Sequence, residues 1–176
     1  MEFKKIQLNG FKSFAEKTNF LIEDGLTGIV GPNGCGKSNI VESLRWVMGE
    51  TSAKSMRGSG MEDVIFSGTS NKASKNIAEV SIEVENKDKE GPIQYRELEQ
   101  IQVRRKIEKD KGSKFYINDK EVRARDAQMF FADLSTGAHS PSMISQGRIG
   151  ALVTAKPTDR RAILEEAAGI SGLHVR

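Results

Sequence analysis

Apolar and polar residues alternate along much of the chain, most regularly at Asn76–Glu85, where every second residue is Ala, Val or Ile. A period of two places these apolar side chains on one face of an extended chain, which predicts an antiparallel strand with one buried face. Asn118 and Asp119 separate two shorter runs and predict a two-residue hairpin turn. Further strands are predicted at 3–11, 18–22, 101–107, 114–117 and 120–122.

Two short apolar runs, Leu26–Val30 and Met61–Phe66, also predict strands, the first of them buried. Helical spacing replaces the alternation at 39–48, at 124–134 and after Pro157, where apolar residues on one side predict a helix that continues to Arg176. The charged segment 87–92 ends in Gly-Pro, which predicts an exposed loop. The order of these elements predicts an α/β fold whose first part is rich in strands.

The composition is that of a soluble chain of ordinary size. With 176 residues, 37% hydrophobic and 29% charged, it is long enough for one domain with a hydrophobic core. No apolar run approaches the ~20 residues that cross a membrane, so we expect neither a transmembrane helix nor a membrane partner. The N-terminus lacks the features of a signal peptide. A single cysteine, Cys35, favours a reducing compartment, and we expect the protein in the cytoplasm.

The net charge of +3 and the pI near 9.0 are too mild to establish a nucleic-acid partner. Between residues 104 and 114, however, six basic residues stand against two acidic ones. This cluster is compatible both with a solvated hairpin and with a surface that contacts phosphates. Its basic residues are Arg104, Arg105, Lys106, Lys109, Lys111 and Lys114.

The segment Gly31–Ser38 reads GPNGCGKS and matches the phosphate-binding pattern G-x-x-x-x-G-K-[ST] at every fixed position. Its glycines allow the backbone to turn tightly and to bring N–H groups close to phosphate oxygens. Lys37 supplies a charge for the β- and γ-phosphates and Ser38 a hydroxyl for Mg²⁺, while the following helix directs its positive dipole end at the anion. The sequence therefore predicts a nucleoside triphosphate site, with contacts from Pro32, Asn33, Gly34, Cys35, Gly36, Lys37, Ser38 and Asn39.

A phosphate loop does not identify a reaction, because hydrolases, kinases and motors share it. Met129–Asp133 has the hydrophobic-run-then-Asp form of a Walker B strand, which would complete the Mg²⁺ site of a small P-loop kinase. Its apolar residues continue the helical spacing from Ala127, and we interpret it as a helix. Leu134–Ala138 resembles the signature motif of ABC ATPases but runs into a proline instead of opening a helix. With both interpreted as non-functional, the loop needs catalytic partners from elsewhere.

Several segments together resemble the N-terminal half of the ATPase head of SMC (structural maintenance of chromosomes) proteins of bacterial type. They cover nearly the whole chain and are much more specific than the phosphate loop. The segments are 6–14 (IQLNGFKSF), 31–50 (the loop and the helix that follows it), 54–58 (KSMRG), 63–66 (DVIF), 144–149 (ISQGRI) and 160–170 (RRAILEEAAGI).

SMC heads are ABC-type ATPases whose two lobes lie at opposite ends of a very long chain, separated by a coiled coil and a hinge. The resemblance implies that residues 1–170 form the N-terminal lobe and that 171–176 begin the outgoing coiled coil. It implies an α/β P-loop NTPase fold with a mixed sheet around the P-loop helix and an antiparallel β subdomain. The signature motif and the Walker B Asp-Glu pair would then belong to the C-terminal lobe.

The resemblance also implies roles for two residues beyond the phosphate loop. Gln146 is similar to the Q-loop glutamine, which completes the Mg²⁺ shell with Ser38 and senses the γ-phosphate. Arg57 is similar to the arginine of the R-loop, which approaches the phosphates and is linked to DNA-stimulated hydrolysis, although a solvated loop arginine is the alternative. The expected catalytic residues are thus Lys37, Gln146 and Arg57, and the expected metal ligands are Ser38 and Gln146.

Three further residues resemble positions that contact the nucleotide. Lys12 and Ser13 look like the pair that approaches it from the side, and Asp63 belongs to a segment similar to the one near the adenine. The implied cofactors are ATP and Mg²⁺.

The resemblance implies an ATP-driven motor for chromosome condensation and segregation, associated with the nucleoid. Its implied partners are DNA, bound with little sequence preference, the C-terminal lobe of the same chain, a second copy joined through head and hinge, and a kleisin-type accessory subunit. Candidate DNA contacts are the basic residues between Arg104 and Arg125.

The sequence leaves three further functions open. A related coiled-coil DNA-repair ATPase such as RecN is disfavoured by the EEAAG stretch at 165–169. A nucleotide-gated DNA-binding scaffold would bind ATP without turnover, and a small P-loop kinase would use Asp133. We expect the isolated fragment to bind ATP weakly and to hydrolyse almost none until the C-terminal lobe is added.

Overall fold

The computed structural model describes residues 1–53, 56–87, 89, 92–134, 156–158 and 161. In this part of the chain six strands form one sheet in the order β2-β1-β3-β4-β5-β6, and every neighbouring pair is antiparallel. The strands are β1 (Glu2–Asn9), β2 (Thr18–Leu21), β3 (Ile77–Glu85), β4 (Gln100–Glu108), β5 (Gly112–Ile117) and β6 (Lys120–Val122). The helices are α1 (Lys37–Val47), α2 (Ala124–Asp133) and the 3₁₀ turns η2 (Met61–Val64) and η3 (Ile93–Tyr95).

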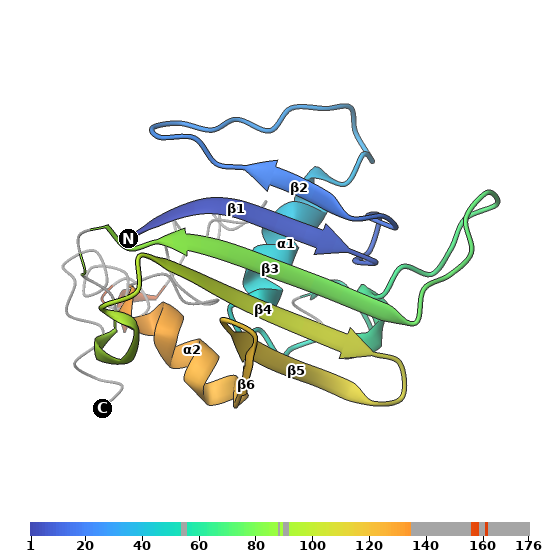
Figure 1. Cartoon of the computed structure of the whole chain (residues 1–176). Helices are drawn as coiled ribbons and strands as arrows, with labels where there is room; N and C mark the ends of the chain where they lie inside the picture. Colours follow the sequence, from blue (N-terminus) through green and yellow to red (C-terminus); the bar gives the residue numbers. More distant parts are fainter. Residues whose placement is uncertain (54–55, 88, 90–91, 135–155, 159–160, 162–176) are drawn as a thin grey trace.

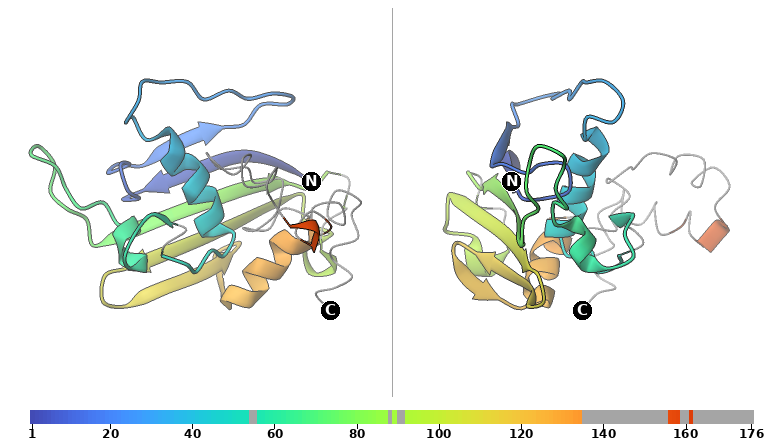
Figure 2. Two further views of the ribbon diagram at one scale, coloured as in Figure 1. Left: turned by 180° about the vertical axis from the view of Figure 1, so that it is seen from behind. Right: turned by 90° about the vertical axis from the view of Figure 1, so that its right-hand side faces the viewer.

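Both α-helices pack on the same face of the sheet, as Figure 2 shows from behind, and the opposite face is open in Figure 1. The alternation along β3 explains this arrangement, because Ala78, Val80, Ile82 and Val84 are buried against the helices. Trp46 from α1 is fully buried in the same core. The phosphate loop thus leads into a helix that is anchored on the sheet by its apolar face.

Several sequence predictions are confirmed by these elements. The strands predicted at 3–11, 18–22, 76–85, 101–107, 114–117 and 120–122 correspond to β1 to β6, and the helices predicted at 39–48 and 124–134 correspond to α1 and α2. Asn118 and Asp119 have φ of 47° and 63°, the left-handed values that a two-residue type I′ turn requires at both positions. Met129–Asp133 lies in α2, which confirms that its backbone is a helix and not a Walker B strand.

The prediction of a buried strand at Leu26–Val30 is wrong. This segment pairs with none of the described strands and passes outside β2, the edge strand of the sheet (Figure 1). Leu26 is 99% exposed and Val30 is 94% exposed. A buried strand needs neighbours on its edges and cover on its faces, which the described residues do not supply. The sheet of the described residues is thus wholly antiparallel, and Leu26–Val30, the segment before the P-loop helix, pairs with none of its strands.

The strand predicted at Met61–Phe66 is also wrong, because the chain forms the 3₁₀ turn η2 there and only Ile65 makes an isolated bridge, to Phe11. The cause is local. The carboxylate of Asp63 accepts hydrogen bonds from the N–H groups of Ser59 and Gly60 at 2.6 and 3.0 Å, which closes a tight turn in place of an extended chain.

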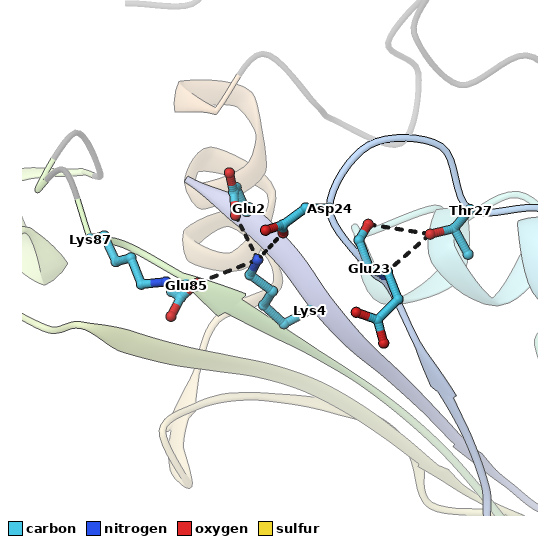
Figure 3. Close-up of polar contacts among 7 residues, drawn as sticks. All are labelled: Glu2, Lys4, Glu23, Asp24, Thr27, Glu85 and Lys87. Carbon is cyan, nitrogen blue, oxygen red and sulfur yellow. Dashed lines mark hydrogen bonds and ion pairs between the residues drawn. The ribbon is translucent and has the colours of Figure 1, made fainter.

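Lys4 fastens the chain that follows β2 to the sheet (Figure 3). Its ammonium lies 2.6 Å from the carboxylate of Asp24, 2.7 Å from that of Glu2 and 3.5 Å from that of Glu85, which Lys87 also pairs at 3.0 Å. The hydrogen bond to Asp24 raises the pKa of Lys4 and lowers the pKa of Asp24. The hydrogen bond from Lys87 lowers the pKa of Glu85. This ion cluster holds the start of the exposed segment against β1 and β3.

The C-terminal predictions fall mostly outside the described residues. Pro157, Thr158 and Arg161 have helical backbone, in agreement with a helix that opens at Pro157. Gln146, the signature-like stretch 135–138 and the predicted start of a coiled coil at 171–176 lie outside the described residues. No helix in the part of the chain that the structure describes is long and apolar enough to cross a membrane.

Candidate nucleotide-binding site

The phosphate loop depends on glycine at two positions. Gly34 and Gly36 have φ of 83° and 95°, in the left-handed region that other residues rarely adopt. A Cβ atom on Gly36 would also lie 2.5 Å from the hydroxyl oxygen of Ser13. Glycine at this position therefore allows both the turn into α1 and the close approach of Ser13 from the β1–β2 connection.

Helix α1 begins at Lys37 with a free N-terminus. No side chain of the described residues caps it, and its first turn has no acidic residue. The N–H groups of a first helical turn have no partner within the helix, and the helix dipole adds positive potential there. Such an end fits the phosphates of a nucleoside triphosphate.

The ammonium of Lys37 lies inside the loop. It donates hydrogen bonds to the carbonyl oxygens of Gly31 and Pro32, the second at 2.7 Å. An ammonium has three N–H donors, so the two carbonyl contacts and a weaker one to the sulfur of Cys35 hold it in the loop. Cys35 is a free thiol, exposed at the same loop, with its sulfur 3.9 Å from the Lys37 nitrogen.

Three other predicted residues meet beside the start of α1. The Asn39 side chain donates to the hydroxyl of Ser13 at 2.9 Å and accepts from Nη2 of Arg57 at 2.8 Å. Asn39 follows Ser38 directly, so this chain of hydrogen bonds ties Arg57 and Ser13 to the first turn of the P-loop helix. The structure therefore brings together residues that are far apart in the sequence.

Glu42 joins this group and was missed by the sequence analysis. Its carboxylate forms ion pairs with the ammonium of Lys12 and with Nε of Arg57, and Lys12 also donates to the carbonyl oxygen of Met56. Only 8% of Glu42 is exposed. The sequence feature that could have identified Glu42 is its position four residues after Ser38, which places both side chains on one face of the helix.

Lys12 and Arg57 share a backbone feature as well as a partner. Their φ angles are 47° and 55°, in the left-handed region that costs energy for residues with a Cβ. Both residues sit in connecting segments, and both are bonded to the same carboxylate. The ion pairs with Glu42 therefore offset local strain in two segments that border the phosphate loop.

Asp63 has a local role in the structure. Its carboxylate accepts from the N–H groups of Gly60 and Ser59 and from the Ser59 hydroxyl, and these bonds, led by the one from Gly60, lower its pKa. It thereby shapes the turn that follows Arg57. A contact of Asp63 with an adenine stays a prediction.

Ser38 is the described residue that can supply a ligand to Mg²⁺. It is exposed in the first turn of α1, while Gln146 lies outside the described residues. Among the described residues no group of three His, Cys, Asp or Glu side chains could hold a metal ion. Mg²⁺ at a triphosphate site takes several of its ligands from phosphates and water.

An open apolar groove of about 1070 Å³ lies next to the loop. It runs between β2, the unpaired segment before the loop and one face of α1, and aliphatic and aromatic side chains such as Phe20, Val30 and Leu44 line it. Ser38 and Arg57 line it too, so the groove is continuous with the predicted phosphate site. A groove with this lining is suited to burying apolar protein surface.

The basic cluster of residues 104–114 is less available to phosphates than its sequence indicates. Arg104 pairs with Glu79 at 3.3 Å and Asp119 at 2.8 Å, while Lys111 and Lys114 each pair with a neighbouring glutamate. Apart from the buried Arg105, the basic residues between 104 and 125 that form no ion pair with another described residue are Lys106, Lys109, Lys120 and Arg125.

Arg105 is a correction to the list of candidate DNA contacts, because it is only 3% exposed. Its guanidinium lies 4.6 Å from the ring centres of both Trp46 and Phe115. It donates to the carbonyl oxygens of Trp46 at 2.8 Å and Glu50 at 2.6 Å. Burial lowers its pKa to about 10. Arg105 therefore clamps β4 onto the C-terminal end of α1 and does not face a partner.

Comparison with known proteins gives a consistent family match. Residues 2–148 match the model of the RecF/RecN/SMC N terminal domain. The chain is 55% identical over 176 residues to the chromosome partition protein Smc of Cereibacter sphaeroides. That match covers the whole chain and 15% of the relative, so the chain spans about a seventh of the length of this curated protein.

Two solved structures share the fold. One concerns the structural biochemistry of ATP-driven dimerization and DNA-stimulated activation of SMC ATPases. It matches with a TM-score of 0.84 and 30% identity over 95% of this chain and 99% of that chain. The other is an SmcHead bound to the C-winged helix domain of ScpA, with a TM-score of 0.90 and 31% identity over 97% of this chain and 52% of that chain.

Proposed function

The chain belongs to the RecF/RecN/SMC N-terminal domain family, and its fold is that of the N-terminal part of an SMC ATPase head. From this premise we propose that it is the ATP-binding N-terminal lobe of an SMC-type ATPase that organises chromosomes. Residues 1–170 would form the lobe, and 171–176 would begin the outgoing coiled coil. The proposal extends to the rest of the polypeptide and to a second head, which would complete the site.

The observation that carries the proposal is an unfinished pocket. The phosphate loop stands beside an open apolar groove, and the segment that leads into it, Leu26–Val30, is exposed and unpaired among the described residues. Exposed apolar surface of this extent marks an interface. We infer that its occupant is the C-terminal lobe of the same polypeptide, which would pair a strand with Leu26–Val30 and fill the groove. The much greater length of the curated relative supports this choice.

The residues predicted to bind the triphosphate have different roles. The loop N–H groups and the N-terminus of α1 hold the phosphates, and Lys37 contributes positive charge to the β- and γ-phosphates. Ser38 would ligate Mg²⁺ with Gln146, and the metal, when bound, neutralises phosphate charge. Arg57 would stabilise the charge that develops during hydrolysis, and Lys12 and Ser13 would contact the nucleotide from the side.

Hydrolysis would couple to the association of two heads. ATP held on this lobe would meet the signature motif of a second head, so that two ATP molecules join the heads and hydrolysis separates them. DNA would bind mainly through its phosphates to unpaired basic residues, which makes its affinity fall with salt. The solved relatives support this scheme, since one concerns ATP-driven dimerization and DNA stimulation and another is bound to ScpA, a partner that fits the proposed kleisin-type subunit.

Reconstitution tests the proposed function. This chain should hydrolyse almost no ATP, and adding the C-terminal lobe should produce DNA-stimulated hydrolysis. Lys37→Ala should lower the hydrolysis rate at least about a hundredfold, the usual loss when a donor to transition-state charge is removed. Turnover by the 176 residues without the C-terminal lobe, or none after reconstitution, would contradict the proposal. The second outcome with ATP still bound would favour a nucleotide-gated scaffold.

The kinase and the RecN-like ATPase are less well supported than a chromosome-organising ATPase. A small P-loop kinase would need a Walker B strand at Met129–Asp133, where the backbone is helical. A RecN-like repair ATPase falls within the same family model, but the curated relative with 55% identity is a chromosome partition protein. We therefore keep chromosome organisation as the proposed function.

A further inference from the structure

We propose that Glu42 is a positioning residue for ATP hydrolysis, which sets the direction of Arg57 and Lys12 beside the phosphate loop. The inference rests on the proposed ATPase function. Glu42 touches neither the loop backbone nor the predicted Mg²⁺ ligand Ser38 through any hydrogen bond or ion pair that the described residues make. It would therefore act on the reaction through the two cations that it holds.

Each oxygen of the Glu42 carboxylate forms an ion pair with one cation. Oε2 pairs with the ammonium of Lys12, and Oε1 pairs with Nε of Arg57. Only 11% of the Glu42 side chain is exposed, so neither ion pair is well screened by water. The carboxylate thus ties the β1–β2 connection and the segment after α1 to one point on the P-loop helix.

Arg57 is held on two of its edges. Nε bonds to Glu42 and Nη2 donates to the amide oxygen of Asn39 at 2.8 Å, and both acceptors are on α1. A guanidinium is planar and rigid, so two fixed bonds also fix the direction of its remaining N–H groups. The Arg57 side chain is 58% exposed and lines the groove next to Ser38, so those groups are accessible to a phosphate.

Glu42 also holds Lys12 in place. Its ammonium pairs with Glu42 and donates to the carbonyl oxygen of Met56, the residue just before Arg57. The backbones of Lys12 and Arg57 both have left-handed φ angles, which their segments would tend to leave without an external restraint. Glu42 supplies that restraint to both segments at once.

The charges give a specific kinetic expectation for Glu42→Gln. The substitution leaves two cations without their shared anion, so affinity for the triphosphate should be unchanged or higher. The guanidinium loses its fixed direction, so the chemical step should slow. Misplacing a group that acts on the transition state costs between about ten- and a hundredfold in rate. We therefore expect kcat to fall by about that factor while KM stays equal or decreases.

The experiment uses the complete head, this chain with the C-terminal lobe, and measures kcat and KM for ATP with DNA present. The variants are Glu42→Gln, Glu42→Asp, Arg57→Ala and the double variant Glu42→Gln/Arg57→Ala. The matched control is Glu83→Gln, which breaks an ion pair with Lys5 of 2.5 Å on the open face of the sheet. Its kcat and KM should equal those of the unsubstituted head.

The decisive comparison is the effect of Glu42→Gln in two backgrounds. If Glu42 acts mainly through Arg57, the kcat loss should shrink to less than about twofold when Arg57 is already alanine. An unchanged kcat, or the same loss in both backgrounds, overturns the proposal. If Glu42→Gln does not fold, Glu42→Asp takes its place in the same comparison of the two backgrounds. Aspartate keeps the negative charge, but its shorter side chain does not reach both cations. An unsubstituted head without hydrolysis refutes the proposed function instead.

Discussion

Arg105 lies in the middle of a basic stretch of sequence, yet its guanidinium is enclosed by Trp46 and Phe115 and bonded to backbone carbonyls at the end of α1. Glu42 is the reverse case, because it reads as a solvated helical acid and only its position four residues after Ser38 places it beside the phosphate loop. Both residues take their roles from neighbours that are distant in the chain. The sequence therefore predicts a residue whose motif is local, such as Lys37, but not the roles of Arg105 and Glu42, whose partners come from distant parts of the chain.

Replacing Arg105 tests its structural role. Arg105→Met keeps a long side chain but removes the guanidinium donors to the carbonyl oxygens of Trp46 and Glu50, of which Trp46 still accepts from the N–H of Gly49. Hydrogen bonds to a charged group contribute about 1.5–3 kcal/mol, so we expect the free energy of unfolding to fall by about 2–4 kcal/mol in a urea titration. Lys106→Met, on the open face of the same strand, is the control and should change it by less than about 0.5 kcal/mol. Equal effects of both substitutions would refute the role assigned to Arg105.

At the scale of elements, the sequence predicted what neighbouring residues decide. The alternation of β3 and the Asn118-Asp119 turn need only local chemistry and an apolar surface to pack on, and both are present. The strand predicted at Leu26–Val30 is absent because a strand also needs partners. No strand forms at Met61–Phe66, because the Asp63 carboxylate binds the N–H groups of the two residues just before this segment, Ser59 and Gly60, and so closes a turn there.

The exposed segment before the loop should tolerate polar substitution in this chain. Val30→Asp should change the free energy of unfolding by less than about 0.5 kcal/mol, because the side chain is 94% exposed. The same substitution should weaken binding of the C-terminal lobe at least about tenfold, since it would place a charge in an apolar interface. Ile93→Asp, also exposed but in η3, is the control for binding. Calorimetric titration with the C-terminal lobe measures the difference.

The Lys4 cluster predicts a pH dependence. The lowered pKa values of Asp24 and Glu85 mean that their stabilisation is complete above their ordinary values of 3.8 and 4.5, and is lost as the pH falls through the lowered values. The raised pKa of Lys4 keeps its contribution complete up to 10.5 and removes it at higher pH. The melting temperature of Lys4→Met should therefore be lower than that of the unsubstituted chain between about pH 4.5 and 10.5, and should converge with it in acid.

Salt provides a check on the same cluster. Because the side chains of Glu2 and Asp24 are well exposed, the difference in melting temperature should shrink as ionic strength rises. Lys17→Met removes an exposed lysine that has no ion pair with another described residue, and it should produce no pH-dependent difference. A difference for Lys4→Met that does not shrink as the pH falls below 3.8 would contradict the assignment.

At the scale of the whole molecule, the described chain has a core on one side of α1 and an open apolar groove on the other. A helix with apolar surface toward both sides is suited to lie between two layers. The six-stranded sheet supplies the first layer, and we propose that the C-terminal lobe supplies the second. On this account the phosphate loop becomes a complete site only when the second layer is present.

Hydrogen exchange of the Leu26–Val30 amides, measured with and without the C-terminal lobe, tests this most directly. Amides in an unpaired, exposed segment exchange rapidly, and those in a central strand exchange only through larger opening events. We expect fast exchange in the 176-residue chain and protection by at least about a hundredfold after the lobe is added. Amides that stay fast in a head that hydrolyses ATP would contradict it.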